Sequence, residues 1–308
     1  ATCQQSGGRP AGSATPAGAA DRRTRRRVAG AERGQDAMSI SRRTMLRGCA
    51  GAAAALGLAG PAFSAEPGPG EMRIVPRSGE RIPVVGLGSW ITFNVGGDPE
   101  LLDQCARVIS AFAEEGGGMI DSSPMYGSSQ DTIGHGLARL GDASAVFSAD
   151  KVWTSSPAEG PAQIAESRRE WGVRGFDLLQ VHNLRAWKGH LDTLFGMRAE
   201  GRLRHVGVTT PPGRRHDLLE RIMREEPVDF VQLTYNVLDR EPERRLLPLA
   251  RERGIAVIVN RPYRRGALIA RYRDAPLPSW AAEIGAASWA QVLLKFIVSH
   301  PAVTVAIP

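Results

Sequence analysis

The chain has 308 residues, of which 42% are hydrophobic, and a formal net charge of +7. Residues 1–65 hold 10 arginines, no lysine and 3 acidic residues, while residues 66–308 hold 29 basic and 29 acidic residues. The excess positive charge therefore lies in the N-terminal tail, and the neutral remainder argues against a nucleic-acid-binding surface. Residues 66–308 contain a single cysteine, Cys105, so they cannot form an internal disulfide, and its apolar helical surroundings predict a buried thiol.

The tail divides into two parts. Residues 1–37 are rich in Gly, Ala and Arg, lack apolar periodicity and do not begin with Met, so we expect upstream sequence that takes no part in the fold. Residues 38–65 have a charged start, an Ala-rich apolar run and a small-residue end, which is the layout of a secretory signal. The stretch SRRTMLR resembles the twin-arginine (Tat) export signal. The tail thus predicts export to a bacterial periplasm through the Tat machinery, and its apolar run is too short for a stable membrane span.

Residues 66–308 open with a short ribbon (MRIVPRSGERIPV) and then alternate strand and helix patterns. The apolar runs expected to form buried strands are 84–90, 118–121, 146–152, 176–182, 205–209, 230–235, 256–260 and 303–307. The stretches with helical periodicity are 101–115, 162–171, 191–200, 217–226, 243–253 and 289–300.

Eight strands that alternate with helices predict an α/β fold with a parallel sheet. A closed (β/α)8 TIM barrel fits the strand count best. An open doubly wound sheet is the alternative, but the first strand is followed by GLGSWITF, which lacks the third glycine of a dinucleotide-binding turn.

Barrel enzymes carry their chemistry at the C-terminal ends of the strands. The residues predicted at these ends are Trp90, Asp121, Lys151, His182, Thr209, Thr210, Gln232, Asn260 and Arg261. Asp121 and three other candidates each have a purely structural explanation taken alone. These are a turn residue for Asp121, a half-buried core ring for Tyr126, a solvated cation for Lys151 and a hydrogen-bonded core histidine for His182. Lys151 is nevertheless unusual, because the chain has only three lysines among 39 basic residues.

Together with Tyr126, three of these residues can form a proton-donor site. A tyrosine has a pKa of about 10, and a nearby ammonium favours the phenolate and lowers that pKa. Asp121 can hold Lys151 in place, and His182 can offer an N–H to a carbonyl oxygen. The carbon of that carbonyl needs a hydride, which no side chain supplies, so the pattern predicts a nicotinamide cofactor.

The segments VVGLGSW, MIDSSPMYGSSQDTIGHGL, ADKV, DLLQVH, GRLRHVGVTT and RPYRRGAL resemble motifs of the aldo/keto reductase family, in the family's order. The resemblance implies reduction of an aldehyde or ketone with NADP, or alternatively NAD, as cofactor. It implies Tyr126 as general acid, supported by Asp121, Lys151 and His182, with Trp90 in the substrate pocket. No metal is implied.

The resemblance also assigns cofactor contacts to Thr209, Thr210, Gln232, Asn260 and Arg261. Thr209 and Thr210 stand where Ser and Asn are usual, so Thr210 loses an amide contact. Asn260 stands where an aromatic often stacks on the nicotinamide. Residues 66–308 are expected to be a barrel that is truncated after strand eight, because the family's later phosphate-binding segment is absent from this sequence.

Two other functions fit the sequence less well. One is a non-enzymatic barrel that binds cofactor as a redox sensor or partner-binding scaffold, which the departures at Thr210 and Asn260 favour. The other is an unrelated barrel enzyme such as a sugar isomerase or glycosidase, which needs a metal cluster or facing carboxylates. The strand ends offer only one acid and one histidine, Asp121 and His182.

Overall fold

Eight parallel strands form the centre of the fold. The computed structural model describes residues 71–143 and 146–308, so the predicted segments 1–37 and 38–65 lie outside the described residues. The strands run in one continuous order from β10 to β3, with every neighbouring pair parallel. Their bounds are β3 (Leu87–Gly88), β4 (Met119–Asp121), β5 (Phe147–Val152), β6 (Leu178–Val181), β7 (His205–Thr209), β8 (Phe230–Thr234), β9 (Ala256–Asn260) and β10 (Val305–Ile307).

The two outer strands of this order meet and close the sheet. Ala306 of β10 donates its N–H to the carbonyl of Val84 at 2.8 Å and accepts from the N–H of Gly86 at 2.9 Å. A side chain at Gly86 would be too close to the backbone of Met119 and the side chain of Ile307, so glycine permits this approach. The predicted (β/α)8 barrel is confirmed, and the open sheet is excluded.

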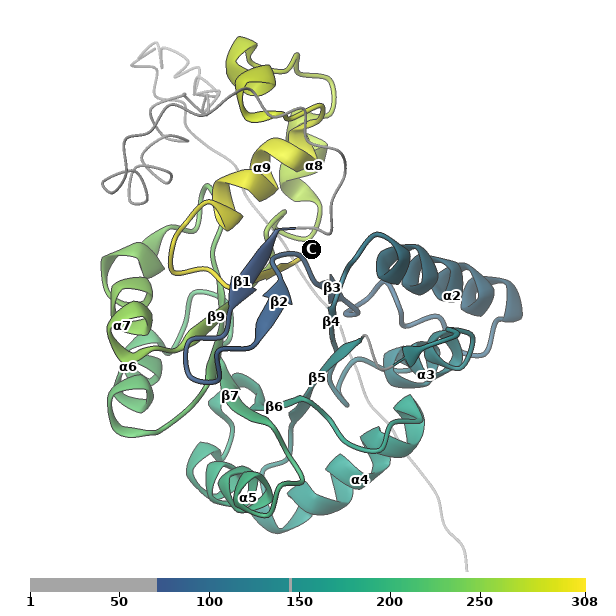
Figure 1. The fold of residues 1–308 in the computed structure, drawn as a ribbon, viewed down its shortest axis with the longest axis vertical. Helices are drawn as coiled ribbons and strands as arrows, with labels where there is room; N and C mark the ends of the chain where they lie inside the picture. The colour runs from purple at the N-terminus through teal and green to yellow at the C-terminus, as the bar shows by residue number, and fades with distance from the viewer. Residues whose placement is uncertain (1–70, 144–145) are drawn as a thin grey trace, which may run out of the picture. The chain divides into compact units, whose positions relative to one another are not determined.

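Helices surround the strands (Figure 1). Their bounds are α2 (Pro99–Glu114), α3 (Ser129–Leu137), α4 (Gly160–Trp171), α5 (Trp187–Ala199), α6 (His216–Glu225), α7 (Leu246–Arg253), α8 (Ala267–Tyr272) and α9 (Trp289–Val298). Short 3-10 turns occupy η2 (Pro157–Glu159), η3 (His182–Leu184), η4 (Glu241–Arg244) and η5 (Ser279–Ile284). Within the described ranges, no helix is long and apolar enough to cross a membrane. Cys105 on α2 is buried, as predicted.

The sequence pattern did not predict α3 and α8. Helix α3 contains Gly134 and Gly136, which weaken a helical pattern because glycine has a low helix propensity. A Cβ at Gly134 would collide with the carbonyl oxygen of Glu170 in α4, and one at Gly136 would collide with Ile109 in α2. The same glycines that hide the helix in the sequence therefore let it pack tightly between its two neighbours.

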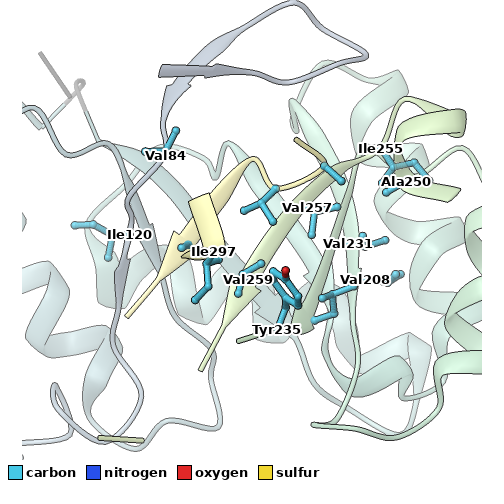
Figure 2. Packing of buried hydrophobic residues seen from close by; sticks show 14 of the residues in the cluster. Val84, Ile120, Val208, Val231, Tyr235, Ala250, Ile255, Val257, Val259 and Ile297 are labelled. Atoms are coloured by element: carbon cyan, nitrogen blue, oxygen red, sulfur yellow. The ribbon is translucent and has the colours of Figure 1, made fainter. Parts of the chain in front are cut away.

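Two apolar clusters hold the barrel together. The larger lies between strands and helices, and Figure 2 shows part of it, with Val231 and Val257 from the strands and Ala250 and Ile297 from α7 and α9. The smaller lies inside the barrel. Strands buried on both faces explain the near-continuous apolar runs of the sequence.

A hairpin of β1 (Met72–Ile74) and β2 (Arg81–Pro83) covers the N-terminal end of the barrel. Its Val75 and Ile82 belong to the interior cluster, together with Phe147 and Phe230 at the starts of their strands. Because this end is covered, the C-terminal ends of the strands are left to form a site.

At two strand ends a predicted site residue lies outside the strand. The first strand was expected to reach Trp90, but β3 ends at Gly88 and Trp90 lies in the following turn. The fourth was expected to include His182, but β6 ends at Val181 and His182 opens η3. The backbone turns there because Asn183 and Leu184 adopt φ values of 55° and 53°, which a strand cannot continue.

A buried acid lies on the outer side of β5, next to α3 and α4. Asp150 is fully buried and accepts a hydrogen bond from Nε2 of Gln130 at 2.7 Å, while its Oδ1 has no partner. Gln130 also bonds to Ser167 of α4 at 3.1 Å. Burial raises the pKa of Asp150 to about 7, although the Lys151 ammonium opposes this shift.

This raised pKa predicts a pH-dependent stability. The fold is more stable while the buried acid is protonated, because ionising it in the interior is costly. The free energy of unfolding therefore falls as pH rises from about 4, the pKa of the carboxyl in the unfolded chain, toward 7, its pKa in the folded protein. Between pH 5 and pH 8 the loss amounts to about 2–3 kcal/mol. Asp150→Asn, which stays neutral, should abolish this part of the pH dependence and be the more stable protein at pH 8.

Urea unfolding of the parent and the variant at pH 5 and pH 8 measures this effect. Asp192→Asn on the exposed face of α5 is the matched control and should follow the parent at both pH values. An equal loss of stability with pH in the parent and in Asp150→Asn would contradict the assignment.

Candidate active site

A cavity of about 380 Å³ opens at the C-terminal ends of the strands. Every residue predicted for the site lines it except Lys151, which is fully buried. The lining residues are Gly88, Ser89, Trp90, Ile91, Thr92, Asp121, Met125, Tyr126, His182, Asn183, Thr209, Thr210, Pro212, Gln232, Asn260, Arg261, Pro262, Tyr263, Arg265, Gly266, Ile307 and Pro308. The barrel thus gathers predicted site residues that are up to 171 residues apart in the sequence, from Trp90 to Arg261.

Lys151 and Asp121 form a buried ion pair. Nζ of Lys151 donates to Oδ2 of Asp121 and to the carbonyl of Ser122, both at 2.6 Å. The two side chains are 0% and 3% exposed. Burial alone would lower the pKa of Lys151, but the Asp121 carboxylate and its neighbours outweigh burial and raise it. The lysine is therefore a fixed ammonium beneath the cavity.

Two glutamines saturate the other oxygen of Asp121. Nε2 of Gln180 donates to Oδ1 at 3.1 Å, and Nε2 of Gln232 donates to it at 2.9 Å. A buried carboxylate needs such partners because an unsatisfied charge in the protein interior is costly. The acid is held rigidly from three strands, β5, β6 and β8.

Tyr126 lies above this pair. Nζ of Lys151 is 5.1 Å from the centroid of the Tyr126 ring. Burial raises the pKa of Tyr126, and the Lys151 ammonium counteracts this but does not reverse it. The expectation of a lowered tyrosine pKa is therefore wrong for this structure, because desolvation of the phenolate outweighs attraction to the ammonium. Tyr126 keeps its proton and is available as a donor.

His182 stands edge-on to Tyr126, with ring centroids 5.7 Å apart. Burial and the Lys151 ammonium lower the pKa of His182 to about 2, so the ring is neutral near physiological pH. Its Nδ1 lies 2.8 Å from Oγ of the fully buried Ser123. That Oγ already accepts from the N–H of Met125 at 3.5 Å. The donor in this contact depends on the tautomer of the ring, and with the Ser123 hydroxyl as donor to Nδ1 the ring proton lies on Nε2.

The two threonines predicted to contact cofactor have different environments. Oγ1 of Thr209 accepts the backbone N–H of Asn183 at 2.8 Å. Oγ1 of Thr210 is buried, lines the cavity and has no hydrogen-bond partner in the described structure. A buried hydroxyl without a partner is unusual in a folded protein, so Thr210 fits a position that bonds to a ligand.

Gln232 and Asn260 line the cavity and are hydrogen-bonded to each other and to neighbouring side chains. Oε1 of Gln232 accepts from Nδ2 of Asn260 at 3.3 Å, and Oδ1 of Asn260 accepts from Thr234 at 2.7 Å. Each primary amide offers two N–H donors and two lone pairs, so Gln232 keeps one of each for a carboxamide. Asn260 supports Gln232 through this hydrogen bond.

Trp90 and Arg261 form a wall of the cavity. The Trp90 ring is tilted against Tyr126, with centroids 6.3 Å apart, and Cζ of Arg261 lies 5.2 Å from the Trp90 ring. Both residues were predicted for the site, but the structure shows the arginine stacked on the tryptophan. Among residues 71–143 and 146–308, no group of three or more His, Cys, Asp or Glu is arranged to hold a metal ion.

The family model of the aldo/keto reductase family matches residues 84–308, which contain the whole barrel and all of these residues. The chain belongs to the aldo/keto reductase family. The resemblance found in the sequence motifs is thereby confirmed at the level of the family.

Curated relatives of this aldo/keto reductase are distant. It is 28% identical over 208 residues to the aldo-keto reductase str7 of Strobilurus tenacellus, covering 62% of this chain and 61% of the relative. It is 26% identical over 220 residues to the NADH-specific methylglyoxal reductase of Escherichia coli, covering 60% and 64%. The chain thus spans about three fifths of the length of the curated relatives it matches.

Solved structures support the same fold. An aldo-keto reductase from Bacillus halodurans in its holo form has a TM-score of 0.62 and 19% identity, covering 77% of this chain and 85% of that one. An aldo/keto reductase from Klebsiella pneumoniae in complex with NADP and acetate has a TM-score of 0.64 and 22% identity, covering 76% and 83%.

Sequence reasoning missed several residues of this aldo/keto reductase site. Gln180 stands two residues before His182, so the two-residue period of a strand could have identified it as facing the same side. Ser123 and Arg265 carried no such signal. Ser123 looked like a turn residue, and the position of Arg265 depends on the loop conformation after β9.

Proposed function

We propose that this aldo/keto reductase reduces an aldehyde or ketone to the alcohol with NADPH, or NADH, as the hydride source. The observation that carries the proposal is the buried Lys151–Asp121 pair beneath Tyr126, with His182 edge-on to the same tyrosine. A buried ion pair is costly to desolvate and is weak evidence for a stabilising role, so its position beneath Tyr126 favours a part in proton donation.

Each residue has a definite part in the proposed reaction. Tyr126 donates its phenolic proton to the carbonyl oxygen while the carbonyl carbon accepts a hydride, so the products are an alcohol and a phenolate that water reprotonates. The Lys151 ammonium stabilises the phenolate that remains, and Asp121 fixes the lysine. His182, with its proton on Nε2, can donate a hydrogen bond to the carbonyl oxygen and orient it.

A reduced nicotinamide, when bound, supplies the hydride that no side chain can provide. The unpartnered hydroxyl of Thr210 and the spare amide valences of Gln232 fit a polar cofactor group at this cavity. The names of relatives and neighbours agree, because they include an NADH-specific methylglyoxal reductase and structures in complex with NADP and NADPH. They support either dinucleotide for this chain.

The proposal is tested by titrating the full chain with NADPH and NADH, followed by nicotinamide fluorescence. Loss of absorbance is then measured after addition of methylglyoxal and a panel of simple aldehydes and ketones. We expect binding of at least one dinucleotide and carbonyl-dependent oxidation. Binding without turnover of any carbonyl would favour the non-enzymatic barrel, and no binding by the folded protein would overturn the nicotinamide assignment.

Ser123 should matter for turnover through the tautomer of His182. In Ser123→Ala, Nδ1 loses its donor, so the ring can place its proton on either nitrogen. We expect kcat to fall by about tenfold, the size of one neutral hydrogen bond of about 1 kcal/mol or slightly more, with little change in KM. Nitrogen-15 NMR of the histidines should show His182 protonated on Nε2 in the parent and a mixture in the variant.

The control is Ser110→Ala on α2, which removes a hydroxyl bonded only to Glu114 and should change neither signal nor rate. A His182 ring that carries its proton on Nδ1 in the parent would contradict this assignment.

We further propose that residues 38–65 direct export of the folded protein through the twin-arginine route to the periplasm. The motif SRRTMLR, followed by the Ala-rich apolar run, supports this proposal. When a bacterium expresses the full chain, the parent should appear in the periplasmic fraction. The double variant with Arg42→Lys and Arg43→Lys should be absent from it. The pair Arg22→Lys with Arg23→Lys is the control and should be exported normally. Equal export of the two double variants would contradict the proposal that residues 38–65 are a twin-arginine signal.

A further inference from the structure

The backbone directly after His182 turns through an unusual conformation. Asn183, Leu184 and Ala186 have φ values of 55°, 53° and 44°, in the left-handed region. Asparagine tolerates that region, whereas leucine and alanine seldom adopt it because the Cβ atom crowds the backbone. Strained backbone of this kind persists where the surrounding structure enforces it, so contacts from elsewhere in the fold must hold this turn.

Two side chains, one at the end of β7 and one in the loop that follows it, hold the turn. Oγ1 of Thr209 accepts the N–H of Asn183 at 2.8 Å. Nη1 of Arg215 donates to the carbonyl of Asn183 at 3.0 Å and to the carbonyl of Leu184 at 3.3 Å. Asn183 is therefore bonded through both of its backbone polar groups. We call these three hydrogen bonds the Thr209–Arg215 clamp.

Arg215 reaches the turn from a stiff base. Its carbonyl accepts the N–H of Leu219 in the first turn of α6 at 2.9 Å. The segment before it contains Pro211 and Pro212, whose rings fix φ, and the N–H of Arg214 donates to the carbonyl of Pro211 at 3.1 Å. In the part of the chain that the structure describes, the Arg215 guanidinium forms no ion pair, so its donors serve the two carbonyls.

The orientation of His182 depends on this turn. The side chain is 6% exposed, and its Nδ1 lies 2.8 Å from Oγ of Ser123. That contact holds one ring nitrogen, so the direction of the other nitrogen is set by the backbone from which the side chain projects. The carbonyl of His182 accepts the N–H of Arg185 at 3.1 Å and closes the turn. A displaced turn would therefore rotate the ring relative to Tyr126, whose ring centroid is 5.7 Å away.

We infer that Arg215 is a positioning residue for carbonyl reduction, because it holds the backbone of residues 183–184 and thereby fixes His182 against Tyr126. This inference rests on the proposed function. Arg215 is exposed and does not line the cavity, so it acts through the turn and not through contact with substrate. Thr209, the other member of the clamp, holds the same turn through its hydroxyl.

The test compares Arg215→Met with the parent, both as the full chain. Methionine keeps a long apolar stem but has no N–H donor, so the two carbonyls lose their partner. We expect kcat for methylglyoxal to fall about tenfold, while KM and the Kd for NADPH stay within about twofold. Arg214→Met is the matched control from the same loop and should keep the parent kcat. The side chain of Arg214 is exposed, does not line the cavity and has no hydrogen bond or ion pair among the described residues.

Two further readouts separate positioning from a general loss of stability. Arg215→Lys keeps a cation with N–H donors on a long stem, so we expect it to recover most of the lost kcat. Amide hydrogen exchange at Asn183 should be at least tenfold faster in Arg215→Met than in the parent or in Arg214→Met. The amides of β8 should exchange at the parent rate in all three proteins, because only the turn is released.

Nitrogen-15 NMR of His182 decides the inference even if the parent reduces no carbonyl, in which case the proposed function fails. We expect the ring signals of His182 to shift in Arg215→Met and to match the parent in Arg214→Met. Unchanged signals in Arg215→Met overturn the inference. With an active parent, a kcat of Arg215→Met within twofold of the parent value also overturns it, even if exchange at Asn183 is faster. A tenfold weaker Kd for NADPH in Arg215→Met would assign the arginine to the cofactor and overturn it as well.

Discussion

Tyr126→Phe should lower kcat for every carbonyl substrate by about a thousandfold, within the range of 10²–10⁴ that a positioned proton donor contributes. The substitution removes only the phenolic oxygen, and the ring keeps its contacts with Trp90 and His182. Without the proton, the oxygen that gains negative charge must take a proton from water. Binding of NADPH should stay within about threefold, because the hydride step and not binding is affected.

The measurement is single-turnover oxidation of bound NADPH after addition of carbonyl, with thermal unfolding as the check on folding. Tyr235→Phe is the control, since it also removes a buried phenolic oxygen, which donates to Glu243 at 2.7 Å outside the cavity. That variant should lose stability but keep its turnover. A Tyr126→Phe protein that retains a tenth or more of the parent rate would exclude Tyr126 as the proton donor.

Lys151→Met should have the second large effect, on stability as well as on turnover. The substitution leaves the Asp121 carboxylate buried, with two glutamine donors and no cation. Breaking a buried ion pair from one side costs about 3–5 kcal/mol, because the remaining charge is uncompensated. Turnover should fall by at least a hundredfold, because nothing then stabilises the phenolate that Tyr126 leaves.

A second variant separates the two consequences. Lys151→Met combined with Asp121→Asn removes both charges and keeps an amide oxygen for the two glutamine donors, so most of the lost stability should return. Turnover should not return, because the ammonium is still absent. Urea unfolding and single-turnover rates of both variants give the answer. Full stability of the single variant, or restored activity of the double variant, would contradict this account of the pair.

Much of the fold could be predicted because local patterns carry it. Strands buried on both faces produce continuous apolar runs, such as 256–260, and amphipathic helices produce periodic ones, such as 101–115. Helix α3 could not be predicted in this way. Its Gly134 and Gly136 are selected by close contact with α4 and α2, and contact between helices leaves no local periodicity.

Part of the site could be predicted in the same way. Parallel strands in a barrel end at the same side. Asp121, Lys151 and His182 are predicted at or near the ends of three strands, so the sequence alone places them on one rim. The direction of the pKa shift of Tyr126 could not be predicted. Burial of the phenol raises this pKa and the nearby ammonium lowers it, so the result depends on which effect is larger. That comparison requires three-dimensional positions.

The sequence by itself thus determined the barrel, its family and the four residues proposed for proton transfer, since these follow from periodicity, order and residue type. Only the tertiary structure decided how those residues are held. Gln180 and Gln232 saturate Asp121, Ser123 lies within hydrogen-bond distance of Nδ1 of His182, and the loop after β9 places Arg261 over Trp90. These contacts join strands and loops that are far apart in the chain, and their distances and burial set the energies, so no local pattern can encode them.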